Sequence, residues 1–246
     1  MPHNPASHLH PHPHRHRHCT LTALVTVLCS FPVLAAPKDA PQEEGVRLLG
    51  GIGWTYDDNL LRVPDDEQPF EGQRSDAYRT LEAGVVYRKT ISRQRIAATA
   101  KVSKVKFDHF GQLDYDGRDL LASWLWEASS KFEGRAEALY IKTLAPYTDF
   151  DSDERNLRQQ RRQVLDAGWK LHPSWKLRVG AARDKTTYEL LAQRYNDRTE
   201  KTYEAELVYR PKGGSSVGLV ARRIKGEYPY RRPYNSSALT DDFTQD

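Results

Sequence analysis

Cysteine, methionine and long hydrophobic runs are scarce in this chain. Its 246 residues include one methionine and two cysteines, Cys19 and Cys29. Both cysteines lie within the first 35 residues, so the remainder of the chain has no disulfide and no thiol chemistry. Only 38% of the residues are hydrophobic, 28% are charged, and the mean hydropathy is −0.75. These values exclude a helical membrane protein, which needs runs of about 20 apolar residues.

The longest apolar stretch lies near the N-terminus and predicts a secretory signal. Residues 21–34 are too few to span a bilayer, and Val33-Leu34-Ala35 forms a small-residue cleavage pattern. We therefore expect a signal peptide over residues 1–35 and a short periplasmic segment over residues 36–45. The start of the signal is rich in histidine: His3, His8, His10, His12, His14, His16 and His18. Such a tract can bind metal, but a weakly basic leader that is removed with the signal explains it more simply.

Charge gives no support for a nucleic-acid partner. The chain has 37 basic residues, and removal of Arg15 and Arg17 with the signal leaves 35 against 33 acidic residues, a net charge of +2. No basic run with interleaved aromatic residues is present, so we expect no binding to nucleic acid. Nothing in the sequence indicates a cofactor.

Apolar and charged residues alternate with a period of two through most of the chain. For example, Phe132, Gly134 and Ala136 alternate with Glu133 and Arg135. Nine such segments are present, and residues 242–246 could begin a tenth. The pattern predicts β-strands with one apolar and one charged face. At residues 105 and 107 the apolar phase changes, which predicts a β-bulge near residues 103–104.

The segments between the predicted strands alternate in length. Short turns are expected at residues 91–92, 129–130, 172–174 and 211–214, and long polar loops at residues 57–75, 108–117, 145–156, 184–198 and 225–241. Aromatic residues flank the short turns on the apolar face: Tyr87, Trp126, Phe132, Trp169, Trp175 and Tyr209. Short periplasmic turns, long extracellular loops and aromatic girdles are typical of outer-membrane barrels. A soluble β-sandwich or solenoid also alternates, but it does not explain this placement.

The sequence thus predicts an all-β, antiparallel, up-and-down transmembrane β-barrel over residues 46–246, located in the outer membrane. Nine or ten strands do not include the aromatic-ended final strand expected of such a barrel, and an open sheet in lipid leaves backbone groups unpaired. We therefore expect an incomplete barrel, either a truncated product or one closed by several copies.

Several motifs resemble a known family. The most specific is Asp57-Asp-Asn-Leu-Leu-Arg-Val-Pro-Asp65 at the first predicted loop; Phe107-Asp108, Leu113-Asp-Tyr115, Trp124-Leu-Trp126 and Tyr228-Pro-Tyr-Arg231 follow it. The chain from Val46 to Asp246 is similar to EpsL-type outer-membrane proteins, encoded with exopolysaccharide-biosynthesis genes and often beside the exosortase (PEP-CTERM) system. The resemblance implies a role in making or exporting polysaccharide and transfers no catalytic residue. The His-rich start departs from the family.

Two sets of residues are candidate binding sites. Predicted inward-facing charges form a basic ladder beside an acidic one and could contact polysaccharide: Arg158, Arg162, Lys170, Lys176, Arg178, Glu200, Glu204 and Glu206. Ordinary cross-strand ion pairing is the simpler interpretation of the same residues. Asp57, Asp58 and Asn59 offer oxygen ligands to Ca²⁺, although an Asx-rich turn bonded to its own backbone is the preferred interpretation.

The function we expect is a non-enzymatic pore or accessory for exopolysaccharide export. Only His109 and His172 follow the signal, and neither has a nucleophile and an acid at motif spacing. The alternatives are a general or sugar-selective porin, and a barrel-type enzyme or adhesin. The expected partners are outer-membrane lipid with lipopolysaccharide, the polysaccharide, and other export components.

Overall fold

The computed structural model describes residues 44–147, 152–230 and 243–245. The predicted signal peptide, its histidine tract and nearly all of the segment over residues 36–45 lie outside the described residues.

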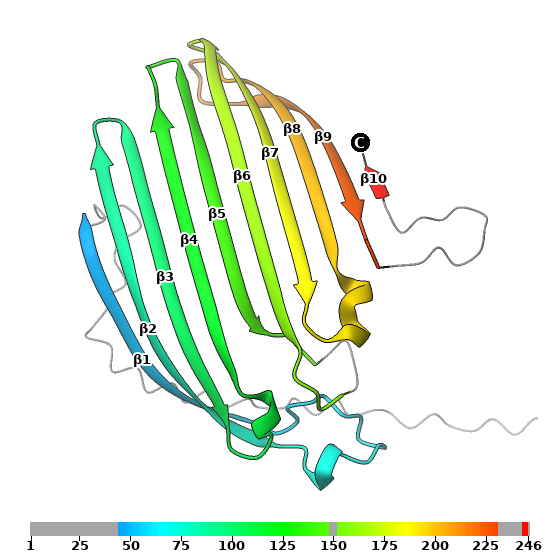
Figure 1. Cartoon of the computed structure of the whole chain (residues 1–246). Coiled ribbons are helices and arrows are strands. Elements are labelled where there is room, and N and C mark those ends of the chain that lie inside the picture. The colour runs from blue at the N-terminus through cyan, green and yellow to red at the C-terminus, as the bar shows by residue number, and fades with distance from the viewer. Residues whose placement is uncertain (1–43, 148–151, 231–242, 246) are drawn as a thin grey trace, which may run out of the picture.

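The described residues form a single antiparallel sheet in which each strand pairs with its neighbours in sequence (Figure 1). The strands are β1 (Gly45–Asp57), β2 (Asp76–Ile91), β3 (Gln94–Phe107), β4 (Tyr115–Glu127), β5 (Phe132–Leu144), β6 (Leu157–His172), β7 (Trp175–Tyr188), β8 (Arg198–Tyr209), β9 (Val217–Glu227) and β10 (Phe243–Gln245). The predicted all-β, up-and-down arrangement is confirmed, and β10 pairs with β9 at the expected place for a tenth strand. The sheet is open, because within the described residues β1 pairs only with β2 and β10 only with β9.

Each strand has one apolar and one polar face, and the register aligns these faces across the sheet. Val46 lies opposite Tyr87 and Leu48 opposite Val85, while Arg47 between them points the other way. The apolar residues are the more exposed: Leu48 is 80% and Ile52 70% exposed. Side chains on the inside of a curved sheet crowd together and those on the outside spread apart, so the apolar face is the convex one and the charged face the concave one.

The expected bulge near residues 103–104 is wrong. Strands β2 and β3 pair without a register shift from Tyr78 opposite Phe107 to Ile91 opposite Gln94. Val105 and Phe107 therefore lie on the concave face, where they are 3% and 8% exposed. The apolar residues move to the concave face here because they pack against apolar side chains of the long loops. The register shift that the structure does show lies between β6 and β7, at Lys170 and His172.

Long loops gather at one end of the sheet and short turns at the other (Figure 1). The loops contain the short 3₁₀ helices η1 (Phe70–Gly72), η2 (Gly111–Leu113) and η3 (Leu191–Asn196). Three predicted loops are shorter than expected, because β4 already begins at Tyr115, β7 continues to Tyr188 and β9 continues to Glu227. Among the described residues, no helix combines the length and the apolar character needed to cross a membrane.

The buried hydrophobic core lies at the loop end of the concave face. It joins the first three long loops to the C-terminal end of β3. Its members are Leu61, Val63, Val105, Phe107, Phe110, Leu113 and Tyr147. Phe110 and Leu113 are fully buried. The loops at this end are thus a packed structure, held in place by the burial of apolar side chains.

Candidate functional site: the charged concave face

Two neighbouring hollows lie on the concave face near the short turns. Their volumes are about 410 Å³ and 510 Å³, and Glu133 and Arg178 line both. Together they are lined by seven basic and four acidic residues: Arg93, Arg95, Arg135, Lys170, Lys176, Arg178 and Arg210, with Glu127, Glu133, Asp166 and Glu206. This end of the concave face therefore has an excess of positive charge.

A three-residue ion cluster joins the two hollows. The carboxylate of Glu133 on β5 pairs with the Nζ atom of Lys170 on β6 at 2.9 Å and with that of Lys176 on β7. Gly168 lies beneath the cluster, where a Cβ atom would come within 3.0 Å of the Lys176 side chain and 3.4 Å of Glu133. The absence of a side chain at this position lets the three charged groups meet across three strands.

Further ion pairs cross the concave face in successive strands. Arg135 contacts Asp166 at 2.9 Å, and Arg162 contacts Asp184 at 3.6 Å. Closer to the edge of the sheet at β10, Arg222 of β9 contacts Glu204 of β8 at 2.6 Å. These pairs fix the orientation of the polar groups, which lets them present a defined array of donors and acceptors to a polar ligand.

The eight predicted inward-facing residues all lie on the concave face, but they do not form one site. Lys170, Lys176, Arg178 and Glu206 line the hollows near the short turns. The other four lie further toward the loops: Arg158, Arg162, Glu200 and Glu204. Arg178 lies directly opposite Glu206 in the register of β7 and β8, as expected for a basic strand beside an acidic one.

The site also contains residues that the sequence did not single out. Glu133, Arg135 and Asp166 bring together β5 and β6, and Arg95 adds a basic group from β3. In the sequence, their place in the alternation predicts which face of the strand they occupy. It does not predict which residue of the neighbouring strand they contact. The cross-strand register supplies the missing information.

The six predicted girdle residues lie on the convex face at the short-turn end. Phe132 stacks on Trp169 with 5.6 Å between ring centroids, and Trp175 lies 4.7 Å from Tyr209. Each of these pairs occupies directly opposed positions of adjacent strands. Trp126 lies over Gly134, and Tyr87 lies opposite Ala98 on β3. Five of the six therefore form an aromatic row over β4–β8, and Tyr87 on β2 is separated from it by β3.

The side chains of Asp57 and Asn59 bind their own loop. Asp57 accepts the backbone N–H of Asn59 at 3.0 Å and pairs with Arg62 at 2.8 Å. The Asn59 amide group exchanges two hydrogen bonds with the backbone of Val63. This is the Asx-turn arrangement, in which Asp57 and Asn59 hold the loop, and Asp58 takes no part in these bonds. Among the described residues, no group of three His, Cys, Asp or Glu side chains could hold a metal ion.

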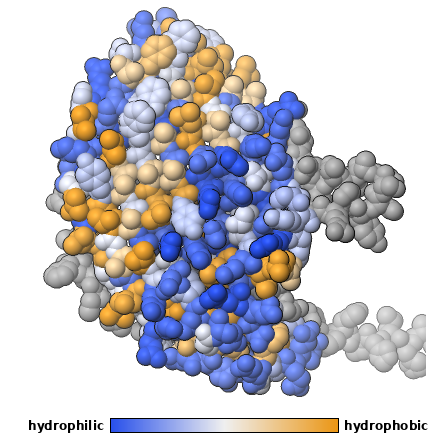
Figure 2. Space-filling view, viewed as in Figure 1, coloured by the Kyte–Doolittle hydropathy of each residue, from blue (hydrophilic) through white to orange (hydrophobic). Residues whose placement is uncertain are grey.

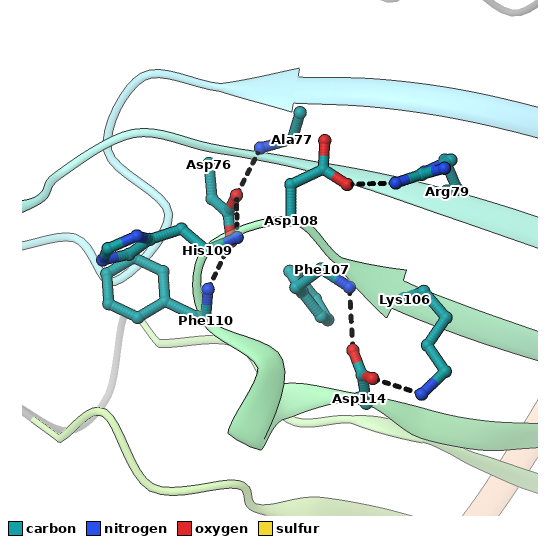
Figure 3. Close-up of polar contacts among 9 residues, drawn as sticks. All are labelled: Asp76, Ala77, Arg79, Lys106, Phe107, Asp108, His109, Phe110 and Asp114. Carbon is teal, nitrogen blue, oxygen red and sulfur yellow. Dashed lines mark hydrogen bonds and ion pairs between the residues drawn. The ribbon is translucent and has the colours of Figure 1, made fainter.

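Carboxylates also hold the second long loop (Figure 3). Asp76 at the start of β2 accepts backbone N–H groups of His109 at 3.0 Å and Phe110 at 2.9 Å. Asp114 accepts the Phe107 N–H at 2.8 Å and the Lys106 ammonium at 2.5 Å. Burial acts to raise the pKa of Asp114, but these two bonds outweigh it and hold the pKa below its ordinary value.

The fourth long loop is held by Asp197, whose carboxylate accepts the Tyr188 N–H at 2.7 Å. Burial raises the pKa of this carboxyl group despite that bond and the nearby Arg194 and Lys185. Asn156 of the third loop accepts the Leu190 N–H at 3.1 Å and so links the third loop to the fourth. Polar side chains thus connect the loops as the apolar core does.

No protein-family model, curated protein or solved structure matches this chain. The resemblance to EpsL-type outer-membrane proteins therefore stays a prediction.

Proposed function

We propose that this chain forms a non-enzymatic outer-membrane β-barrel that serves exopolysaccharide biosynthesis or export, as a pore or as a secretion accessory. The observation that carries the proposal is the division of one continuous sheet into an exposed apolar convex face and a charged concave face. In a lipid bilayer the convex face contacts acyl chains and the concave face lines an aqueous lumen.

Strand length and turn placement support insertion in a membrane. The nine long strands have 11 to 16 residues, and a tilted strand needs about 9–11 to cross the hydrocarbon core. The aromatic row lies beside the short turns, where rings would meet the interface. A broad apolar surface facing water would drive association in a soluble protein.

The concave face supports a polar ligand. The hollows near the short turns present fixed charges of both signs, with positive charge in excess. Such an array can bind the hydroxyl and carboxylate groups of an acidic polysaccharide while it passes through the lumen. In this proposal further strands, from the same polypeptide or from another copy, pair with the open edge of β1 and complete the barrel.

Tryptophan fluorescence offers a direct test of membrane insertion. All five tryptophans lie on the convex face: Trp54, Trp124, Trp126, Trp169 and Trp175. We expect brominated lipids to quench their emission in reconstituted vesicles and aqueous iodide to quench it weakly. Strong quenching by iodide together with no effect of brominated lipid would contradict insertion.

Gene deletion tests the role in export. We expect loss of secreted polymer and accumulation of precursor in the periplasm, with both reversed by the wild-type gene. A complementing gene that encodes Lys170→Gln, Lys176→Gln and Arg178→Gln should restore export only in part. Normal secretion in the deletion strain, with altered uptake of small sugars, would instead identify a sugar-selective porin.

A further inference from the structure

The convex face is not apolar along its whole length. Toward the long loops, seven basic residues of β4–β9 occupy the same face as the apolar residues nearer the short turns: Arg118, Lys142, Arg161, Arg183, Lys185, Lys201 and Lys225. We call this set the basic belt. Figure 2 shows the two regions, with hydrophobic side chains gathered over the upper part of the strands and hydrophilic ones dense toward the loop end at the bottom.

The register brings like charges together within the basic belt. Arg118 lies directly opposite Lys142, and Arg161 opposite Lys185. Lys201 lies between Arg183 and Lys225 on its two neighbouring strands. Like charges in directly opposed positions repel and destabilise a sheet. A protein that retains four such contacts on one surface gains from an anion that neutralises them.

The chain supplies little of the neutralising charge itself, although Asp197 lies near Lys185. Lys201 pairs with Glu227 at 2.8 Å. Within the described part of the chain, the other six residues of the belt form no ion pair with an acidic side chain. The concave face differs, since there the basic groups alternate with acids and pair with them.

An apolar groove meets the basic belt. It is a hollow of about 440 Å³ over β3–β6, with Ala98, Ala100, Ala122 and Ala138 among its lining residues. Tyr140 and Arg161 line it at the belt end, where the guanidinium carbon of Arg161 lies 5.6 Å from the centre of the Tyr140 ring. Small side chains on three adjacent strands, β3 to β5, leave room for an alkyl chain beside the taller neighbours.

We propose that the basic belt and the groove bind a phosphorylated, acylated glycolipid of the lipid A type, with phosphates on the belt and an acyl chain in the groove. This inference rests on the proposed function, because it requires the convex face to contact a membrane with the long loops outside. Guanidinium and ammonium groups at the edge of an apolar surface attract anionic headgroups, and arginine binds phosphate with two parallel hydrogen bonds.

The groove favours a lipid over an anionic polysaccharide. A polysaccharide could neutralise the belt, but it has no alkyl chain to fill an alanine-lined hollow. Toward β1, the same end of this face carries Arg79 on β2 and Lys106 on β3, which pair with Asp108 and Asp114, and then Trp54 and Tyr56 on β1. The lipid is therefore expected on the β4–β9 side of the sheet.

Native mass spectrometry of the full chain, refolded in detergent, tests the proposal with two defined probes: bisphosphorylated lipid A and the same lipid A stripped of phosphate. The belt variant is Arg161→Gln, Arg183→Gln, Lys185→Gln. The matched control, Arg88→Gln, Lys131→Gln, Lys212→Gln, also removes three positive charges but near the short turns. A charge-retaining variant, Arg161→Lys with Arg183→Lys, guards against misfolding.

We expect the wild type to bind bisphosphorylated lipid A at least about tenfold more tightly than the dephosphorylated form, because several basic groups each add attraction. The belt variant should lose this preference, while the control and the charge-retaining variant keep most of it. In the wild type, the preference should weaken with added salt; this measurement needs no variant.

The outcomes separate the two proposals. If the chain inserts into vesicles but binds both lipids equally, the lipid-binding proposal is wrong and the barrel proposal stands. If the chain does not insert, both proposals are wrong. If the wild type ignores the phosphates of lipid A but binds a soluble anionic polysaccharide, and the belt variant does not, the surface is a polymer site and the lipid proposal is wrong.

Discussion

The indole ring of Trp126 on β4 lies directly over the α-carbon of Gly134 on β5. The two residues are opposed in the register, and a Cβ atom at residue 134 would come within 2.3 Å of the ring and of the Asp166 carbonyl oxygen. The carbonyl oxygen belongs to the paired backbone of β6, so rotation of a side chain alone cannot relieve the clash.

We therefore expect Gly134→Ala to destabilise the fold by about 1–3 kcal/mol, the range found for overpacked sites. Urea unfolding of the refolded protein, followed by tryptophan fluorescence, measures the change. Gly50→Ala is the matched control, because Gly50 lies on the same face and a Cβ there meets nothing within 4 Å. Equal stabilities of the two variants would show that Trp126 does not press on Gly134.

Removal of the charge on Glu133 should change ion selectivity. Glu133→Gln leaves Lys170 and Lys176 facing each other without their shared carboxylate, so the concave face of the proposed pore becomes more positive near the short turns. In planar bilayers we expect the reversal potential in a salt gradient to shift toward anion preference. Glu137→Gln, on the same face of the same strand, removes equal charge outside the cluster and should shift it less. Identical shifts would argue against a special role for the cluster.

Burial of Asp197 makes the stability of the fourth loop depend on pH. Its pKa is raised in the folded state, so the folded protein holds this proton more tightly than the unfolded chain does. The resulting stabilisation is present below the unfolded pKa of about 3.9 and is lost as pH rises through the folded pKa.

Asp197→Asn retains an acceptor for the Tyr188 N–H without the charge. We expect it to match the wild type at low pH and to exceed it in unfolding free energy at pH 7. Denaturant unfolding between pH 3 and pH 8 measures the difference, with the exposed Asp65→Asn as control. A gap that stays constant with pH would contradict the burial argument.

The loop-end core should hold the long loops in place. Phe110 is fully buried there, so Phe110→Ala leaves a cavity that costs about 3–5 kcal/mol in a well-packed core. We expect trypsin to cleave the first loop faster at Arg62 and Arg74, while the strands stay intact. Leu191→Ala, at a position 75% exposed in the fourth loop, should leave the cleavage rate unchanged.

Much of the fold could be predicted because, in a strand whose two faces meet different environments, apolar and charged residues alternate with a period of two. The apolar phase of β1 or β5 identifies each face, and segments that contain serine, proline or glycine mark the short turns. The aromatic row could be predicted for the same reason. The loop-end core could not, because Val105 packs against residues from other loops, and its change of phase resembles a bulge.

The contacts of the site needed the register as well as the period. Glu133 and Lys176 are separated by 43 residues, and only the pairing of β5, β6 and β7 brings them together. The basic belt was missed for a related reason. Lys185 falls in a stretch that resembles a loop, and only the pairing of β6 with β7 places it opposite Arg161.

Nearest-neighbour pairing along the whole sheet has a consequence for how the chain folds. Each strand from β2 onward completes its ladder on the strand that precedes it in sequence, so each addition closes a single turn or loop, and the entropic cost grows only slowly with loop length. A chain that becomes available from its N-terminus can therefore assemble hairpin by hairpin on a growing template. In this order of assembly, an error of register between β1 and β2 would pass to every later strand, whereas an error in β9 would stay local.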